Sequence, residues 1–276
     1  MPHDPEQITS ASNPRVRQAA VLRDASARRE TGLTLVDGMR ELSRAAAAGV
    51  EITEVFLDGE APADATRDAL VKTLQSRGAR FAVLARKPFE KIAFGSRNEG
   101  VVGVARFAAR PLEAFQVAAD RPVLVIEGVE KPGNVGAILR TADAAGIAGV
   151  IVCDPRTDPA NPAVIRASLG TVFTVPLAVA TSAAAIDWCA RHARRVIAAL
   201  PTGTSLWHEV RLAGNSAILL GSEAHGVSRA WQETGASRRL DYQSVRLPMA
   251  GLADSLNVAA TAAILCYEAV RQAAEH

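Results

Sequence analysis

The chain has 276 residues, of which 49% are hydrophobic and only 4% aromatic, and its formal net charge is +2. This length can bury one large core or two modest ones, and a core rich in Ala, Val, Leu and Ile favours helices packed on a mainly parallel sheet. No apolar run reaches the roughly 18 residues that a membrane span needs, and no apolar segment of the signal-peptide type follows Met1. We therefore expect neither a membrane-spanning segment nor a secretory signal.

The three cysteines, Cys153, Cys189 and Cys266, follow no spacing typical of metal ligands or of a disulfide framework. Their expected role is that of small buried hydrophobic residues in a reducing compartment, which predicts a cytoplasmic protein. No metal site is expected.

Residues 1–107 are expected to form a small α/β domain. In chain order, the pattern predicts a strand at 33–38, a helix at 39–49, a strand at 51–59, a helix at 65–76, and strands at 81–85 and 101–107. Prolines at 111 and 122 flank a stretch without firm strand character, so residues 108–121 are predicted to be a linker.

Charge is distributed unevenly between the two parts of the chain. Residues 1–110 carry 17 Lys and Arg against 14 Asp and Glu, whereas residues 111–276 carry 14 against 15. The excess includes a group of arginines near the start and basic residues in later predicted loops: Arg15, Arg17, Arg23, Arg28, Arg29, Arg86, Lys87 and Arg97. The early group is either a solvated helix face or a surface that contacts nucleic-acid phosphates.

Residues 122–276 are expected to form a second α/β domain. Predicted strands at 122–129, 147–154, 172–178, 196–200, 217–221 and 245–249 alternate with predicted helices at 135–145, 162–169 and 182–194. A long alanine-rich helix over 255–274 closes the chain. This alternation predicts a parallel sheet covered on both faces, and such sheets bind ligands at the carboxyl ends of their strands.

Two strand-to-helix segments of this domain carry glycines beside polar side chains. In the first, Asn134 precedes Gly136 and Arg140, and Asn134 is a candidate helix cap. In the second, Gly221 and Gly226 flank Glu223, whose carboxylate favours a ribose or a cation over a phosphate. Each motif by itself is equally typical of an ordinary capped turn.

A third segment joins the last predicted strand to the closing helix. It runs through Leu247, Pro248 and Met249 to a Ser-Leu-Asn-Val stretch. Ser255 is the predicted cap of the closing helix, and Asn257 lies close enough to reach the loop. By itself this pattern indicates no more than a capped helix.

The order and setting of the three motifs together resemble the SpoU (TrmH) branch of the SPOUT methyltransferases, over about residues 121–275. Upstream, Asn13-Pro14 before a basic stretch, followed by GLTLVDGMREL and AAGVEITEVFL, resembles the small substrate-binding domain of that branch, which is similar to ribosomal protein L30e. The layout is similar to that of the thiostrepton-resistance ribosomal RNA methylases.

The resemblance implies an S-adenosylmethionine-dependent methyltransferase that modifies a ribose 2′-hydroxyl of RNA. It implies a C-terminal domain with a deep trefoil knot, a feature that sequence physics would not suggest. It also implies a homodimer whose active site combines both chains, with the apolar side of the closing helix as a candidate interface through Val258, Ile264, Leu265 and Tyr267.

The family's site residues can be carried onto this chain one by one. The implied cofactor-binding residues are Leu200, Gly221, Glu223, Gly226, Leu247, Met249, Ser255 and Leu256. The implied catalytic residues are Asn134, Arg140, Glu223, Ser255 and Asn257. Because a guanidinium stays protonated in proteins, a phosphate clamp is the physically easier role for Arg140, and a general base is the alternative. His225 receives no role.

Other functions fit the sequence less well. A nucleotide- or NAD-dependent Rossmann enzyme would need GxGxxG after the first strand, and this chain has GVEKPGNVG there. A non-catalytic RNA-binding protein would not need the polar set just named. Ribosomal RNA, most of all 23S, is favoured by analogy because the simplest transfer-RNA members lack the extra domain, and transfer RNA stays the alternative.

Overall fold

The computed structural model describes residues 6–94, 99–237 and 239–275. They form two compact units. The first takes in the chain up to Ala108 together with Asp158–Thr174, and the second takes in Ala109–Thr157 together with the chain from Val175 on. Residues 158–174 were predicted to belong to the catalytic domain, but the structure packs them with the first unit. Arg97 lies outside the described residues.

The described strands of the first unit form one five-stranded mixed sheet in the order β1-β4-β3-β5-β2. Strands β1, β4 and β3 run parallel, whereas β5 pairs antiparallel with both β3 and β2. Their bounds are β1 Glu6–Ile8, β2 Leu33–Asp37, β3 Ile52–Asp58, β4 Arg80–Leu84 and β5 Val101–Arg106. The strands predicted in this region are therefore present, and β1 was missed because it is too short to show a pattern.

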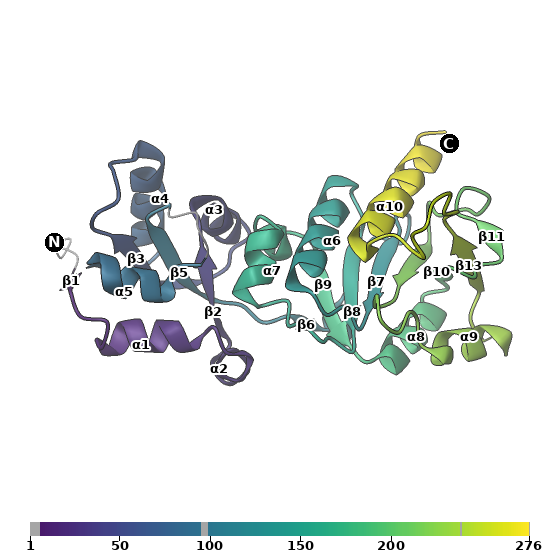
Figure 1. The fold of residues 1–276 in the computed structure, drawn as a ribbon, viewed down its shortest axis with the longest axis horizontal. Coiled ribbons are helices and arrows are strands. Elements are labelled where there is room, and N and C mark those ends of the chain that lie inside the picture. The colour runs from purple at the N-terminus through teal and green to yellow at the C-terminus, as the bar shows by residue number, and fades with distance from the viewer. Residues whose placement is uncertain (1–5, 95–98, 238, 276) are drawn as a thin grey trace. The chain divides into compact units, whose positions relative to one another are not determined.

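Helices cover the two faces of this sheet in pairs (Figure 1). Helices α1 (Pro14–Val21) and α5 (Arg86–Ile92) lie on one side, while α3 (Met39–Ala47) and α4 (Ala65–Ser76) lie on the other. Helix α1 was not among the predicted elements, and it starts at Pro14 because the Asn13 side chain accepts the backbone N–H of Arg15 and Pro14 needs no partner at the first helical position. Arg86 and Lys87, predicted in a loop, open α5 instead.

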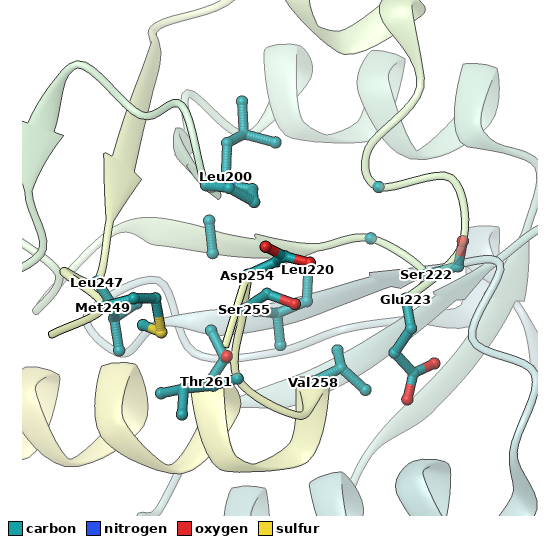
Figure 2. Close-up of a pocket in the computed structure, with 15 residues that line it drawn as sticks. Leu200, Leu220, Ser222, Glu223, Leu247, Met249, Asp254, Ser255, Val258 and Thr261 are labelled. Atoms are coloured by element: carbon teal, nitrogen blue, oxygen red, sulfur yellow. The ribbon is translucent and has the colours of Figure 1, made fainter. Parts of the chain in front are cut away.

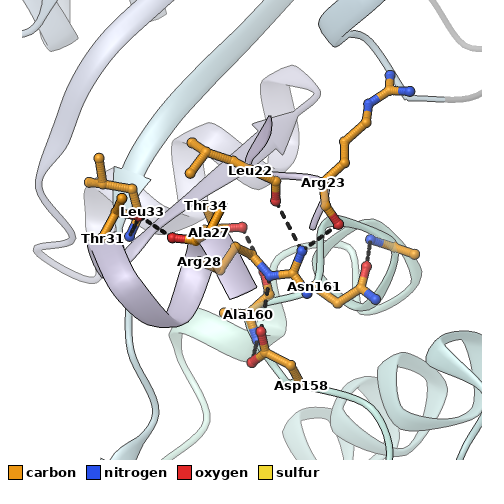
Figure 3. A network of polar contacts seen from close by, with 11 residues as sticks. Leu22, Arg23, Ala27, Arg28, Thr31, Leu33, Thr34, Asp158, Ala160 and Asn161 are labelled. Atoms are coloured by element: carbon orange, nitrogen blue, oxygen red, sulfur yellow. Dashed lines mark hydrogen bonds and ion pairs between the residues drawn. The ribbon is translucent and has the colours of Figure 1, made fainter. Parts of the chain in front are cut away.

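The segment 158–174, which holds α7 (Pro162–Ala167) and a 3₁₀ turn at Thr171–Phe173, packs beside β2 and α3. Arg28 of α2 (Ala25–Thr31) is buried, and its guanidinium donates to Asp158 Oδ2 at 2.9 Å and to the carbonyls of Leu22 and Arg23 (Figure 3). The Thr34 hydroxyl donates to the Ala160 carbonyl at 2.6 Å. Polar contacts and burial of Val164 and Ile165 thus fix this segment to the first unit.

In the second unit the described strands form one eight-stranded sheet in the order β11-β13-β10-β12-β7-β8-β9-β6, and every pairing is parallel. The predicted parallel sheet is confirmed. The strand bounds are β6 Arg110–Pro111, β7 Val123–Glu127, β8 Gly149–Cys153, β9 Leu177–Ala180, β10 Arg195–Ala199, β11 Ser205–Leu206, β12 Ser216–Leu220 and β13 Tyr242–Arg246. The predicted knot stays a prediction.

Both faces of this sheet are covered, as expected. Helices α6 (Pro132–Ala144) and α10 (Val258–Ala274) pack on one side, and α8 (Ser182–Arg191) and α9 (Arg229–Ala236) pack on the other (Figure 1). Trp188 of α8 and Trp231 of α9 are buried against alternate residues of the central strands. All three cysteines are buried and unpaired, and burial raises the pKa of Cys189 and of Cys266 to about 12, so these thiols stay protonated. No helix among the described residues has the length and apolarity to cross a membrane.

Three predictions about local structure were wrong. The predicted linker is part of the second unit, because β6 pairs with β9 and Leu112 and Phe115 are buried in the core. The predicted strand at 172–178 begins as the 3₁₀ turn, since Thr171 and Thr174 hydroxyls bond back to carbonyls of that turn. The strand predicted at 245–249 ends at Arg246, so the Leu-Pro-Met run is a loop.

Candidate active site

The loops that follow β10, β12 and β13 meet at the carboxyl-end edge of the sheet, where a cavity of about 200 Å³ opens (Figure 2). These strands are neighbours in the sheet and parallel, so their carboxyl ends lie at one edge. The cavity is lined by Ala199, Leu200, Pro201, Leu220, Gly221, Ser222, Glu223, Gly226, Leu247, Met249, Asp254, Ser255, Leu256, Val258 and Thr261.

All eight residues that the sequence comparison implied for cofactor binding line this cavity. They come from three loops that are distant in the sequence, yet the fold brings them to one place. Figure 2 shows Asp254 and Ser255 in the middle of the site, with Leu247 and Met249 to one side and Glu223 to the other. Sequence reasoning missed Asp254 and Thr261, since nothing in the pattern shows which side of an irregular loop faces a cavity.

The loop after β12 is folded tightly on itself, and glycine makes this possible. A Cβ on Gly221 would lie 2.1 Å from the carbonyl carbon of Gly226, a separation that no side chain can tolerate. Gly226 has φ of +65°, in the left-handed region that favours glycine. The Ser222 hydroxyl accepts the backbone N–H of His225 at 3.1 Å. The tight turn places Glu223 at the cavity while His225 is outside the lining.

A buried carboxylate at the end of β7 anchors the far side of the same loop. Glu127 accepts hydrogen bonds from the Ser228 backbone N–H at 2.7 Å, the Ser228 hydroxyl at 2.8 Å and the Trp231 indole at 3.2 Å. The hydroxyl of Ser182 also donates to it. Because a buried carboxylate is costly without donors, these contacts fix where the loop 221–228 leaves the cavity and enters α9.

The predicted polar residues Asn134, Glu223 and Asn257 form one hydrogen-bonded chain. The Asn134 amide donates to Glu223 Oε1, and the Asn257 amide donates to Asn134 Oδ1 at 3.2 Å. Neither asparagine lines the cavity itself. The chain therefore fixes the Glu223 carboxylate from α6 and from the start of α10.

Asn134 and Ser255 were wrongly predicted as helix caps, and because neither caps a helix, both side chains are available to the site. Pro132 occupies the first position of α6, so Asn134 lies inside the first turn and its side chain is available to Glu223. Asn257, not Ser255, caps α10, because its Oδ1 accepts the Ala259 N–H at 2.9 Å. Ser255 is left to line the cavity.

Arg140 is the predicted catalytic residue that the structure keeps apart from the others. It lies six residues after Asn134 on α6, about 9 Å along the axis and about 120° around it. Its side chain is exposed, and among the described residues it forms no hydrogen bond or ion pair. A guanidinium that points to solvent is free to bind an anion from outside.

The composition of the cavity fits S-adenosylmethionine. Its walls are mostly aliphatic with backbone groups at the strand ends, which suits an adenine with an apolar face and polar edges. The carboxylates of Glu223 and Asp254 line it as well, and they favour a ligand that carries positive charge, such as a sulfonium, over a phosphate.

An all-parallel α/β sheet with a cavity built from loops at its carboxyl edge is typical of enzymes that bind a small molecule at that edge. The comparisons with known proteins narrow this class. A model of the SpoU rRNA methylase family matches residues 121–267, and a model of the MRM3-like substrate-binding domain matches residues 13–103. The chain belongs to the SpoU rRNA methylase family.

Individual relatives resemble the chain over nearly its whole length. It is 32% identical to the 23S rRNA (uridine(2479)-2′-O)-methyltransferase of Streptomyces viridochromogenes, over 96% of this chain and 92% of that protein. The crystal structure of an RNA 2′-O ribose methyltransferase matches with a TM-score of 0.84 at 34% identity, covering 97% of this chain and 99% of that one. The SpoU methyltransferase AviRb from Streptomyces viridochromogenes, in complex with AdoMet, matches with a TM-score of 0.83 at 28% identity, covering 96% and 100%.

Proposed function

We propose that this protein transfers a methyl group from S-adenosylmethionine to a ribose 2′-hydroxyl of 23S ribosomal RNA, and that it acts as a homodimer in the cytoplasm. The observation that carries the proposal is the cavity at the carboxyl edge, which the loops of the second and third motifs line together with the loop after β10. The names of the relatives support the RNA class. The chain is an S-adenosylmethionine-dependent RNA 2′-O-ribose methyltransferase.

The residues that would hold the cofactor are those that line the cavity. Leu200, Leu247 and Met249 supply apolar walls for the adenosine, and the turn at Gly221 lets backbone groups approach it. S-adenosylmethionine supplies a methyl group that its sulfonium charge already activates. The protein then needs to exclude water, align the 2′-oxygen and help to remove one proton.

We infer that the hydrogen-bonded chain of Asn134, Glu223 and Asn257 does the aligning. Asn134 and Asn257 hold Glu223 in one orientation, and Ser255 lines the same cavity. The proton acceptors that the cavity lining offers are the carboxylates of Glu223 and Asp254. Arg140 clamps the phosphate next to the target ribose through its planar fork.

A homodimer explains apolar surface that the second unit leaves uncovered. Val258 and Leu265, predicted at the interface, are buried in the chain's own core, whereas Tyr267 and Val270 of α10 are exposed by 53% and 39%. Leu252, in the loop beside the cavity, is fully exposed. We infer that a second copy covers this surface and completes the site that holds Arg140.

The decisive assay uses the purified protein, methyl-labelled S-adenosylmethionine and unmodified transcripts of 23S ribosomal RNA and of transfer RNAs. Label should appear in the 23S transcript and, after nuclease digestion, in a 2′-O-methyl nucleoside. Label in transfer RNA alone would overturn the substrate. S-adenosylmethionine binding without transfer to either RNA would favour a non-catalytic RNA-binding protein.

A further inference from the structure

The positive charge of the first unit is concentrated on one helical face. Helices α1 and α5 pack side by side over the same face of the sheet, burying Val16, Ala19, Phe89 and Ile92. Among the described residues, the exposed positions of these two helices carry four basic side chains and one acidic: Arg17, Arg86, Lys87, Lys91 and Glu90. The opposite pair, α3 and α4, exposes Arg40 and Lys72 against Asp68.

The contacts on the α1/α5 face leave donors for a ligand. Within the described ranges, no hydrogen bond or ion pair engages the side chain of Arg17 or of Lys87, and both side chains are exposed. The Lys91 ammonium donates to the Ala11 carbonyl at 3.0 Å, which leaves further N–H groups outward. Arg86 is the exception, because Glu90 accepts its Nε–H at 2.7 Å.

A further arginine extends this face between the ends of the two helices. Arg23 follows α1, donates to the Ala93 carbonyl just after α5, and lies over the Phe94 ring at 5.1 Å to the centroid. These contacts hold the exposed Arg23 guanidinium between the end of α1 and the end of α5. Two arginines of the predicted basic group have other roles: Arg28 is buried on Asp158, and Arg15 is paired with Glu54 and with Glu6 at 2.5 Å.

We propose that the α1/α5 face, defined by Arg17, Arg23, Lys87 and Lys91, docks the RNA substrate through its phosphates. The proposal rests on the methyltransferase function proposed above and names the surface that brings RNA to it. RNA is the occupant because the exposed cations of this face complement phosphates, and the exposed Gln18 of α1 adds an amide that can bond to the backbone of a nucleic acid. Phosphate contacts of this kind position a protein on nucleic acid without reading its sequence.

The test compares two double variants that each remove two positive charges, from opposite faces of the same sheet. One carries Arg17→Gln and Lys87→Gln on the α1/α5 face. The matched control carries Arg40→Gln and Lys72→Gln on the α3/α4 face. The affinity of each full-length protein for an unmodified 23S ribosomal RNA transcript is measured across a series of salt concentrations, with S-adenosylmethionine affinity and melting temperature measured alongside.

The Arg17→Gln, Lys87→Gln variant should bind RNA roughly tenfold or more weakly than the wild type. The slope of the logarithm of its RNA affinity against the logarithm of the salt concentration should fall in magnitude by about one unit for each lost phosphate contact. The control should keep the wild-type slope, and both proteins should keep wild-type S-adenosylmethionine affinity and melting temperature. Equal losses of RNA affinity in the two double variants, or a wild-type salt slope in the Arg17→Gln, Lys87→Gln variant, would overturn the docking face. Failure of the wild-type protein to methylate the transcript would instead overturn the proposed function.

Discussion

We predict that Arg140 is essential for methyl transfer although it has no hydrogen bond to the other predicted site residues among the described ones. We expect Arg140→Ala to reduce methyl transfer below detection while S-adenosylmethionine affinity and melting temperature stay at wild-type values, because the side chain is exposed and lies outside the cavity. Arg140→Lys should fail nearly as badly if the planar fork holds a phosphate. Single-turnover transfer rates test this, and activity within a few-fold of wild type would refute the assignment.

Glu127 is expected to act through the loop that it anchors. Glu127→Gln places an amide N–H where the carboxylate accepted the Ser228 or Trp231 donors, so the variant should lose about 1–3 kcal/mol of stability and bind S-adenosylmethionine several-fold more weakly. Glu130→Gln is the matched control, because Glu130 is exposed three residues along the chain. A folded Glu127→Gln protein with unchanged cofactor affinity would show that the anchor has no part in the site.

For single residues, the sequence predicted correctly which side chains line the cavity, but not which ones cap the helices. Every residue implied for the cofactor lines the cavity, since the motifs follow strands whose ends meet at one edge. The predicted caps Asn134 and Ser255 were wrong, because Pro132 starts α6 early and Asn257 competes for the cap of α10. The roles of the site residues stay predictions.

Among the elements, α7 and its flanks are tied to the first unit by Arg28. Arg28→Ala should lower the free energy of unfolding of that unit by about 3 kcal/mol or more, because it leaves the Asp158 carboxylate and two carbonyls without their donor. Arg29→Ala is the control, as Arg29 is exposed on the same helix and should change stability by no more than about 0.5 kcal/mol. Urea unfolding compares the two, and equal stability of both variants would contradict the account.

The same packing predicts a pH dependence of stability. Burial raises the pKa of Asp37 from 3.8 to about 6, against the lowering effects of the Phe94 backbone and of Arg166, whose guanidinium lies 3.2 Å away. Between about pH 4 and pH 6 the unfolded chain has released this proton and the folded chain has not, so stability should fall as the pH rises through that window, by up to about 3 kcal/mol.

Asp37→Asn should flatten this slope without abolishing it, because burial also raises the pKa of nearby Glu41. Urea unfolding at pH 4, 5 and 6 measures the slope itself, which separates titration from the lost ion pair with Arg166. An unchanged slope in the variant would assign the dependence to other groups.

The sequence pattern predicted most helices and strands but not which sheet each helix covers. Alternating strands and helices predicted the parallel sheet, yet the sequence of an amphipathic helix such as α7 does not indicate which sheet the helix will cover. The apolar residues Val164 and Ile165 read equally well as cover for either unit, and only the fold shows that they pack with the first. The short strands β1, β6 and β11 were missed because two or three residues show no periodicity.

For the whole molecule, the two family models match separate stretches of the chain, at residues 13–103 and 121–267, and the structure divides the chain in the same way except at residues 158–174. The first unit carries the concentrated basic face, and the second carries the cavity with its polar chain. Length and hydrophobic pattern predicted two α/β parts, but not that residues 158–174 of the catalytic half would fold with the other part.

The most direct test of the central claim is a map of 2′-O-methylated nucleotides in 23S ribosomal RNA from cells with and without the gene. We predict that one site loses its methyl group when the gene is deleted, regains it with the wild-type gene, and does not regain it with the Arg140→Ala gene. Identical maps from both strains, with transfer RNA also unchanged, would contradict the account.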